Sequence, residues 1–316
     1  MKIVISEFMN DDSIHKLRDN NNTVVYDPEL YKNKSKLLNE LKSANALIIR
    51  NQTKVDKDLL SSSTVLKVIG RLGVGLDNID FQVINHKNIP VVSAKNANAN
   101  SVAEYVISGM LYFYRPLDFA SIDTKKGNWA RNKHIGNEIH QKTLGLVGTG
   151  EIGHRVALRA KSFGMNVIGY DPFLSPLDFP ISETGIELMD LDEVLQKSDF
   201  VSVHVPFNSS TKNLITKDSL SKMKSTACLI NSSRGGIINE NDLAFALKNK
   251  LISCAILDVL ENEPPSENNM LLTLDNCKIT PHISGLTEES QFRISNLIAN
   301  EVTKELDNKV SIFRVN

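Results

Sequence analysis

The chain has 316 residues, of which 41% are hydrophobic and 23% are charged, and its 36 basic residues nearly cancel its 37 acidic ones. These values are ordinary for a globular protein with one large or two medium domains. The charge balance provides no overall field that favours nucleic acid or an anionic membrane, and no apolar run approaches the roughly 20 residues needed to cross a bilayer. We therefore expect neither a nucleic-acid partner nor a membrane partner.

Residues 1–7 are too short in their apolar part, and turn acidic too soon, for a signal peptide. The cysteines number three, which argues against a disulfide framework, and none forms a CxxC pair: Cys228, Cys254 and Cys277. Each lies in or beside an apolar segment, so we expect buried thiols in a reducing cytoplasm and no metal site.

The first part of the chain alternates short apolar segments with amphipathic stretches. The apolar segments lie at residues 3–5, 24–25, 46–49, 65–69 and 90–92. Alternation of this kind is typical of βαβ units and predicts a parallel sheet.

The alternation of apolar and amphipathic segments stops near Asn96. A polar loop over residues 96–101 ends in Ser101, which is placed as a helix cap, and Glu104 three residues later completes a capping-box pattern. The segment 102–114 is apolar enough to be a buried helix, and Pro116 lies just past its end.

A second series of apolar segments follows at residues 143–148, 166–170, 200–203, 227–231, 253–257 and 277–280. The last thirty residues contain one helix, about 288–306, which must pack on an earlier part of the chain because a single helix cannot bury its apolar face alone. We therefore predict an α/β fold of two parallel-sheet domains, Rossmann-like or flavodoxin-like. A discontinuous substrate domain, residues 1–96 and 286–316, would surround an inserted dinucleotide-binding domain, residues 97–285, with a hinge and a cleft at the two crossings.

Residues 148–153 read GxGxxG, a pattern that is weak alone but gains weight between a predicted strand and a predicted helix. Gly148 would permit the turn, Gly150 would let the backbone approach a diphosphate, and Gly153 would allow the helix to pack closely on the strand. The diphosphate would lie at the helix N-terminus, where free N–H groups and the dipole favour negative charge.

Asp171 ends the next predicted strand, eighteen residues after Gly153. Its carboxylate is suited to accept hydrogen bonds from the ribose hydroxyls and would repel a 2′-phosphate. Pro172 and Phe173 follow it and supply no arginine to bind such a phosphate. NAD is therefore predicted rather than NADP.

Three later strand ends carry residues suited to the reduction of a 2-oxo acid. Arg234 would hold a carboxylate bidentately, His282 would exchange a proton with the C2 oxygen, and Glu263 would orient that histidine and favour its charged form. Each residue also has an ordinary structural interpretation, as a solvated loop arginine, a structural histidine or part of an acidic loop. Their joint position at the carboxyl ends of parallel strands favours catalysis. His204, at another strand end, is the rival acid, although a structural role suits it better.

Taken together, these motifs resemble the D-isomer-specific 2-hydroxyacid dehydrogenase family over nearly the whole chain. They comprise residues 145–153, 231–236, 257–259 with 263–264, and 281–283. The resemblance implies the two-domain fold, a homodimer or homotetramer built largely through the nucleotide domain, and the catalytic roles of Arg234, Glu263 and His282.

The resemblance also implies cofactor contacts. Glu151 stands where many family members have arginine, so only backbone contacts are expected from Glu151 and Ile152. Val205 and Pro206 would line the cofactor, and Asp258 would face the nicotinamide amide.

Within the family, the chain most resembles the D-3-phosphoglycerate dehydrogenases, in the short form without a regulatory domain. That likeness lies in residues 49–53, 70–80 and 129–131, although Asn51 and residues 284–287 depart from the usual pattern. It implies that the amides of Val74 and Gly75 meet the substrate carboxylate. Three arginines would hold the phosphate, the last of them donated by a neighbouring subunit: Arg50, Arg71 and Arg131.

The most specific hypothesis is thus oxidation of D-3-phosphoglycerate to 3-phosphohydroxypyruvate in serine biosynthesis. An alternative keeps the chemistry but uses glyoxylate, hydroxypyruvate or another 2-oxo acid. A third hypothesis, from a different class, is an NAD-sensing binding protein related to transcriptional corepressors that share the fold.

Overall fold

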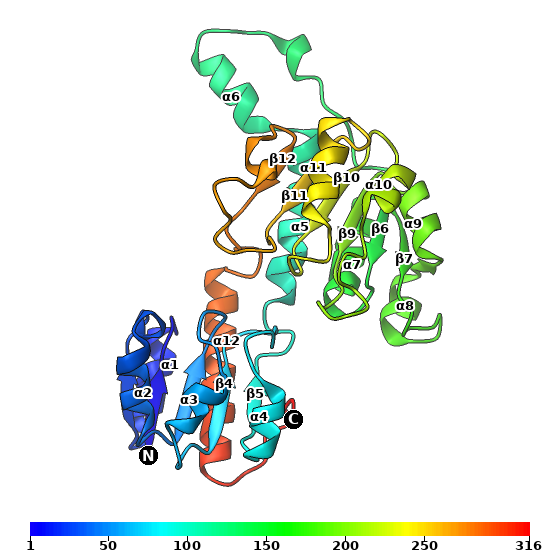
Figure 1. Cartoon of the computed structure of the whole chain (residues 1–316). Coiled ribbons are helices and arrows are strands. Elements are labelled where there is room, and N and C mark those ends of the chain that lie inside the picture. The colour runs from blue at the N-terminus through cyan, green and yellow to red at the C-terminus, as the bar shows by residue number, and fades with distance from the viewer. The chain divides into compact units, whose positions relative to one another are not determined.

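The computed structural model describes residues 1–316, and the chain divides into two compact units (Figure 1). Unit 1 comprises residues 1–98 and 286–316, and unit 2 comprises residues 99–285. All strand pairs of the two sheets are parallel, so the predicted fold class is confirmed.

The sheet of unit 1 has five strands in the order β2-β1-β3-β4-β5, which is the flavodoxin-like order. The strands are β1 (Lys2–Ile5), β2 (Thr23–Tyr26), β3 (Ala46–Ile49), β4 (Val68–Arg71) and β5 (Val91–Ser93). The helices are α1 (Asp11–Asp19), α2 (Lys34–Leu41), α3 (Lys57–Ser61), α4 (Phe81–His86) and α12 (Glu288–Leu306), with a 3₁₀ turn η1 at Leu30–Lys32.

Alternation along the strands of unit 1 sends successive side chains to opposite faces of the sheet. Ile3 and Ile5 pack in one hydrophobic cluster with residues of α1 and α12. Val4 packs in the other cluster with residues of α2, α3 and α4. Helices therefore cover both faces, as the continuous apolar character of these strands requires.

Helix α12 returns to unit 1 because its apolar face has its partners there. Thr287 and Ser290 form a reciprocal capping box at its start. At Gly70 of β4, an added Cβ would lie 2.7 Å from Cγ2 of Val302 and 2.8 Å from Cγ2 of Ile298. The missing side chain therefore allows this helix to lie directly on the sheet.

The tail after α12 covers the β5 edge of the sheet. Arg314 forms an antiparallel bridge with Val92, and the amide of Ser93 donates to the carbonyl of Phe313 at 3.1 Å. The edge strand thus has its backbone groups paired, which removes an exposed edge from unit 1.

The sheet of unit 2 has seven strands in the order β12-β11-β10-β9-β6-β7-β8, the doubly wound Rossmann order with one added strand. They are β6 (Thr143–Val147), β7 (Asn166–Tyr170), β8 (Glu187–Leu188), β9 (Phe200–Val203), β10 (Cys228–Asn231), β11 (Cys254–Leu257) and β12 (Cys277–Ile279). The helices are α5 (Ala99–Tyr114), α6 (Leu117–Lys125), α7 (Glu151–Ser162), α8 (Phe179–Thr184), α9 (Leu191–Lys197), α10 (Lys217–Lys222) and α11 (Glu240–Lys248), with 3₁₀ turns η2 (Arg131–His134) and η3 (Met270–Thr273).

Unit 2 also buries both faces of its sheet. Leu144, Leu146 and Phe200 pack in a cluster with α5 and α7. Val147 and Val203 pack in a second cluster with α9, α10 and α11. Since the order reverses between β6 and β9, the carboxyl ends of these two strands form the switch point at which doubly wound sheets bind ligands.

The predicted cap at Ser101 is wrong. Helix α5 already begins at Ala99, and Ser101 is buried inside its first turn. Ala99 is itself buried and is a strong helix former, so burial of the helix start outweighs the capping pattern that the local sequence offered.

The three cysteines are free and buried, and no three His, Cys, Asp or Glu side chains gather as the ligands of a metal ion would. None of the helices combines the length and the apolar character that a membrane span needs.

The close approach of α12 to β4 has a consequence for stability. Gly70→Ala should lower the free energy of unfolding by about 1–3 kcal/mol, because the added methyl group must displace Val302 and Ile298 in a packed core. Urea unfolding followed by circular dichroism measures the loss. As a control, Gly150→Ala adds its methyl group to open space, with no heavy atom within 4 Å. Equal losses in the two variants would contradict this account of the packing.

Candidate active site

The turn after β6 requires glycine at Gly148, which has a φ of 94°. A Cβ there would also lie 2.9 Å from the carbonyl carbon of His204 and 3.0 Å from the amide nitrogen of Val205. The ends of β6 and β9 therefore approach each other as closely as backbone allows. Val205 and Pro206, predicted to line the cofactor, lie at this switch point.

The start of α7 is open. Gly150 is its N-cap residue and makes no side-chain cap, and an added Cβ would meet nothing within 4 Å. At Gly153, by contrast, a Cβ would lie 2.5 Å from the carbonyl oxygen of Gly148, so the helix packs closely on the turn. The amides of residues 151–153 have no acceptor within the helix, which is the arrangement that binds a diphosphate.

Glu151 directs its carboxylate to Arg155, one helical turn further on. Its side chain is thereby occupied within α7. Backbone contacts of Glu151 and Ile152 with a diphosphate stay a prediction.

Asp171 follows β7 and holds the glycine-rich turn after β6 through hydrogen bonds to Thr149. One carboxylate oxygen accepts hydrogen bonds from the amide of Thr149 at 2.9 Å and its hydroxyl at 3.2 Å, and the other accepts from the amide of Phe173 at 3.0 Å. Thr149 was not singled out from the sequence, although a polar residue between the first two glycines is the signal that could have found it.

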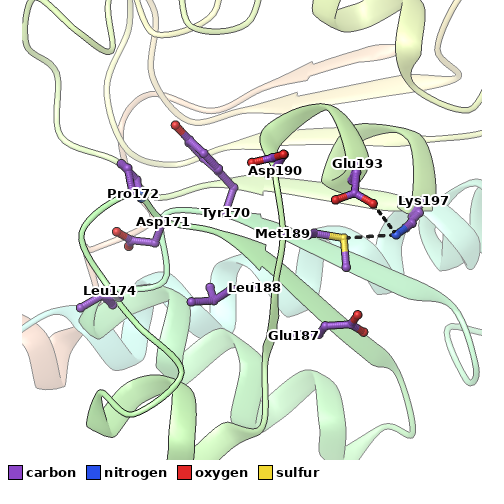
Figure 2. Close-up of a pocket in the computed structure, with 10 residues that line it drawn as sticks. All are labelled: Tyr170, Asp171, Pro172, Leu174, Glu187, Leu188, Met189, Asp190, Glu193 and Lys197. Atoms are coloured by element: carbon purple, nitrogen blue, oxygen red, sulfur yellow. Dashed lines mark hydrogen bonds and ion pairs between the residues drawn. The ribbon is translucent and has the colours of Figure 1, made fainter.

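A cavity of ≈ 650 Å³ opens beside Asp171 (Figure 2). Its charged residues are mainly acidic, and its one lysine, Lys197, pairs with Glu193 at 3.0 Å. The lining residues come from the ends of β7 and β8 and from α9: Tyr170, Asp171, Pro172, Leu174, Glu187, Leu188, Met189, Asp190, Glu193 and Lys197.

The candidate proton carrier is His282, whose Nδ1 lies 2.7 Å from Oε2 of Glu263. The other carboxylate oxygen of Glu263 accepts from the amide of Leu260 at 3.1 Å. Burial raises the pKa of the Glu263 carboxyl, but the hydrogen bond and charge of His282, the amide of Leu260 and the charge of Arg234 together outweigh it, so the pKa lies below its usual value. Glu263 is thus held as an anion against the imidazole.

Asp258 shapes the loop that carries His282. Its carboxylate, only 1% exposed, accepts hydrogen bonds from the amides of Ile283 at 2.8 Å and Ser284 at 2.7 Å and from the hydroxyl of Thr280 at 2.6 Å. Its backbone carbonyl accepts from the amide of His282 at 2.9 Å. The expected contact with a nicotinamide amide is therefore joined by a structural role that the sequence did not indicate.

Arg234 lies in the loop after β10, which two neighbours fix. The buried amide of Asn231 donates to the carbonyl of Arg234 at 2.9 Å and accepts from Ser233. At Gly235 an added Cβ would lie 2.0 Å from the carbonyl oxygen of Leu260, so this loop packs directly on the loop after β11. That contact explains why the charge of Arg234 reaches Glu263.

His204 is unsuited to act as the acid. Its Nε2 hydrogen-bonds the hydroxyl of Ser202 at 2.9 Å, and its Nδ1 is buried with no hydrogen-bond partner. Burial lowers the pKa of this imidazole to about 4, so it carries no proton to donate near neutral pH.

The predicted substrate residues are divided between the units. In unit 1, Arg50 is half-buried with its guanidinium 5.9 Å from the Phe8 ring, and Nη1 donates to Gln291 at 2.5 Å. Arg71 is 7% exposed and donates to the carbonyl of Leu72 at 2.8 Å, beneath the loop that carries Val74 and Gly75. In unit 2, Arg131 is exposed at the start of η2.

Comparison with known proteins adds a family. Residues 107–284 match the model described as D-isomer specific 2-hydroxyacid dehydrogenase, NAD binding domain. A solved D-lactate dehydrogenase of Aquifex aeolicus, complexed with NAD and lactic acid, is similar with a TM-score of 0.87 and 29% identity, covering 98% of this chain and 96% of that one.

Curated relatives are similar over most of the chain. A D-3-phosphoglycerate dehydrogenase of Methanocaldococcus jannaschii is 39% identical over 100% of this chain, which spans only 59% of that relative. An (S)-sulfolactate dehydrogenase of Chromohalobacter salexigens is 38% identical, with 96% of this chain and 98% of the relative covered. A hydroxypyruvate reductase of Thermotoga maritima is 40% identical over 86% of this chain and 88% of the relative.

The buried neutral state of His204 predicts a pH effect. Its pKa is depressed in the folded state, so its stabilising effect is complete above pH 6.5 and is lost as the pH falls toward 4. Between pH 7.5 and pH 5, wild type should therefore lose about 2 kcal/mol more than His204→Gln, which cannot titrate. Urea unfolding at both pH values measures this difference. Parallel losses in the two proteins would show that His204 titrates normally.

Proposed function

The chain belongs to the D-isomer specific 2-hydroxyacid dehydrogenase family, and we propose that it moves a hydride between NAD and C2 of a small D-2-hydroxy acid. The observation that carries the proposal is the pairing of His282 with Glu263 at 2.7 Å, beside the charge of Arg234. An imidazole, its carboxylate partner and a guanidinium are the groups that this reaction requires.

In the oxidation, the chain's own residues bind the acid and move one proton. Arg234 holds the carboxylate with its planar fork, which keeps the C2 hydroxyl toward His282. His282 takes the hydroxyl proton at Nε2, and the Glu263 anion at Nδ1 stabilises the resulting imidazolium. NAD, when bound, accepts the hydride that leaves C2. In the reverse direction the same imidazolium returns the proton to the carbonyl oxygen.

The residues around the glycine-rich turn fit NAD. The open N-terminus of α7 at Gly150 would take the diphosphate, and Asp171 would accept from the ribose hydroxyls. The cavity beside Asp171 adds the carboxylates of Glu187 and Asp190, which would repel a 2′-phosphate. These charges support a preference for NAD over NADP.

D-3-phosphoglycerate is the substrate that we favour, with 3-phosphohydroxypyruvate as its product and serine biosynthesis as its pathway. A dianionic phosphate needs several charge-assisted hydrogen bonds, and Arg50, Arg71 and Arg131 are the cations proposed to supply them. The amides of Val74 and Gly75 would meet the substrate carboxylate. The full-length similarity to a D-3-phosphoglycerate dehydrogenase supports this choice.

One observation favours an unphosphorylated substrate instead, such as hydroxypyruvate or glyoxylate. Arg71 is buried and spends one guanidinium nitrogen on the carbonyl of Leu72, which leaves less of it for a phosphate. The similarity to a hydroxypyruvate reductase supports this second candidate.

A homodimer formed by the arm of unit 2 is part of the proposal. Residues 115–138 include α6 and extend away from the sheet of unit 2 (Figure 1). They expose large apolar side chains that a second copy of the chain would cover: Leu117 at 71%, Phe119 at 52%, Ile122 at 51%, Trp129 at 80% and Ile135 at 80%. Arg131 lies among them and would then reach the neighbouring subunit.

Loss of the proton carrier gives a direct test. His282→Ala should lower kcat by about a thousandfold or more, with the Kd for NAD nearly unchanged, because general acid–base catalysis contributes that much. His154→Ala is the matched control, since His154 pairs with Glu183 outside the proposed site. Turnover that survives in His282→Ala as well as in His154→Ala would remove His282 from the mechanism.

A substrate panel separates the two candidate substrates. If Arg50 binds phosphate, Arg50→Ala should lower kcat/KM about tenfold or more for D-3-phosphoglycerate and much less for glycerate or lactate. Arg18→Ala, an exposed arginine at the end of α1, should change neither value. Equal effects of Arg50→Ala on phosphorylated and unphosphorylated acids would exclude Arg50 from phosphate binding.

A further inference from the structure

The sheet of unit 1 has its own switch point. In the order β2-β1-β3-β4-β5 the direction of winding reverses between β1 and β3, and ligands of such sheets bind at the carboxyl ends of those strands. Glu7 follows β1, and the loop of residues 50–53 follows β3. A carboxylate from the chain itself thus lies where an anionic ligand would otherwise meet loop amides.

The carboxylate of Glu7 accepts hydrogen bonds from the amides of the 50–53 loop. It is 4% exposed, and its Oε1 accepts hydrogen bonds from the amides of Arg50 at 2.8 Å and Thr53 at 2.9 Å. Its Oε2 accepts from the amide of Gln52 at 3.0 Å. Three of the four amides in the loop therefore point inward at one buried carboxylate.

Asn78 holds the same loop from the other side. Its Nδ2 donates to the carbonyl of Arg50 at 2.8 Å and to the carbonyl of Thr53 at 2.6 Å. Asn78 belongs to the segment 70–80, which carries the other predicted substrate residues of unit 1. The two segments are further joined where the amide of Val55 donates to the carbonyl of Asn78 at 2.8 Å.

These contacts determine what the loop can offer to a ligand. The amides of Arg50, Gln52 and Thr53 are used by Glu7, so they are not available to a substrate anion. The guanidinium of Arg50, whose Nη1 donates to Gln291 at 2.5 Å, is the loop's cationic group and lies at the start of the 50–53 segment. Burial lowers the pKa of that guanidinium, and the charge of Glu7 opposes the shift, so the same carboxylate that shapes the loop also favours the charged arginine.

We propose that Glu7 and Asn78 are positioning residues, which hold the 50–53 loop between them so that Arg50 is presented to the anionic substrate. Neither side chain need touch the substrate. The proposal rests on the proposed function, because it assigns the two residues to substrate binding rather than to hydride transfer.

The test compares Glu7→Gln and Asn78→Ala with Glu301→Gln. Glu301 is a matched control, since it is a buried carboxylate of the same unit, 5% exposed, that binds Ser311 and Lys304 away from the loop. Hydrogen exchange of peptides that span residues 50–53 reports on the loop without requiring activity. Steady-state kinetics with NAD and the preferred acid reports on its function.

In Glu7→Gln and Asn78→Ala we expect faster exchange over residues 50–53 and a KM for the acid raised about tenfold. The KM for NAD and kcat should change less than about twofold. General destabilisation would not raise the KM for the acid alone. Glu301→Gln should leave both the exchange and the KM for the acid as in wild type.

Two results overturn the proposal. One is a KM for the acid that rises no more in Glu7→Gln than in Glu301→Gln. The other is hydrogen exchange over residues 50–53 that stays as slow in Glu7→Gln and Asn78→Ala as in wild type. A wild-type protein that turns over no 2-hydroxy acid defeats the proposed function separately. Hydrogen exchange then still decides whether Glu7 and Asn78 hold the loop.

Discussion

The hydrogen bond between Nδ1 of His282 and the carboxylate of Glu263 is the interaction on which the proposed chemistry depends. It joins the loops after β11 and β12, which lie side by side because their strands are neighbours in the sheet. The carboxylate of Asp258 holds the loop of His282 by accepting hydrogen bonds from two of its amides. Gly235 allows the Arg234 loop to contact the loop of Glu263. Without these supports the imidazole would have neither a fixed orientation nor an anion beside it.

Both units use the same architectural rule in different ways. In unit 2 the switch point between β6 and β9 is left open at Gly150, where helix amides are free to meet a diphosphate. In unit 1 the switch point between β1 and β3 is filled by Glu7, which uses the loop amides internally. The sheet end of unit 2 therefore offers backbone N–H donors to a ligand, whereas the sheet end of unit 1 offers side chains carried by a fixed loop.

Much of the fold could be predicted because it is encoded locally. Apolar segments mark the strands, and glycines and strand ends mark the turns, so β7 and β9 begin and end at the predicted residues. The predicted start of α5 was wrong because the helix begins at the buried residue Ala99, and no local sequence pattern indicates that burial. Glu7 and Asn78 were not predicted as site residues because their partners, such as Thr53 for Glu7 and Arg50 for Asn78, lie far along the chain. For Glu7, the available signal was an acidic residue two positions after the apolar strand β1.

The most direct measurement is a crystal structure of the protein with NADH and oxamate, an unreactive analogue of a 2-oxo acid. The account predicts the guanidinium of Arg234 on the oxamate carboxylate and Nε2 of His282 within about 3 Å of the oxygen that corresponds to the substrate carbonyl. Oxamate bound beside the nicotinamide with neither side chain in contact would contradict it.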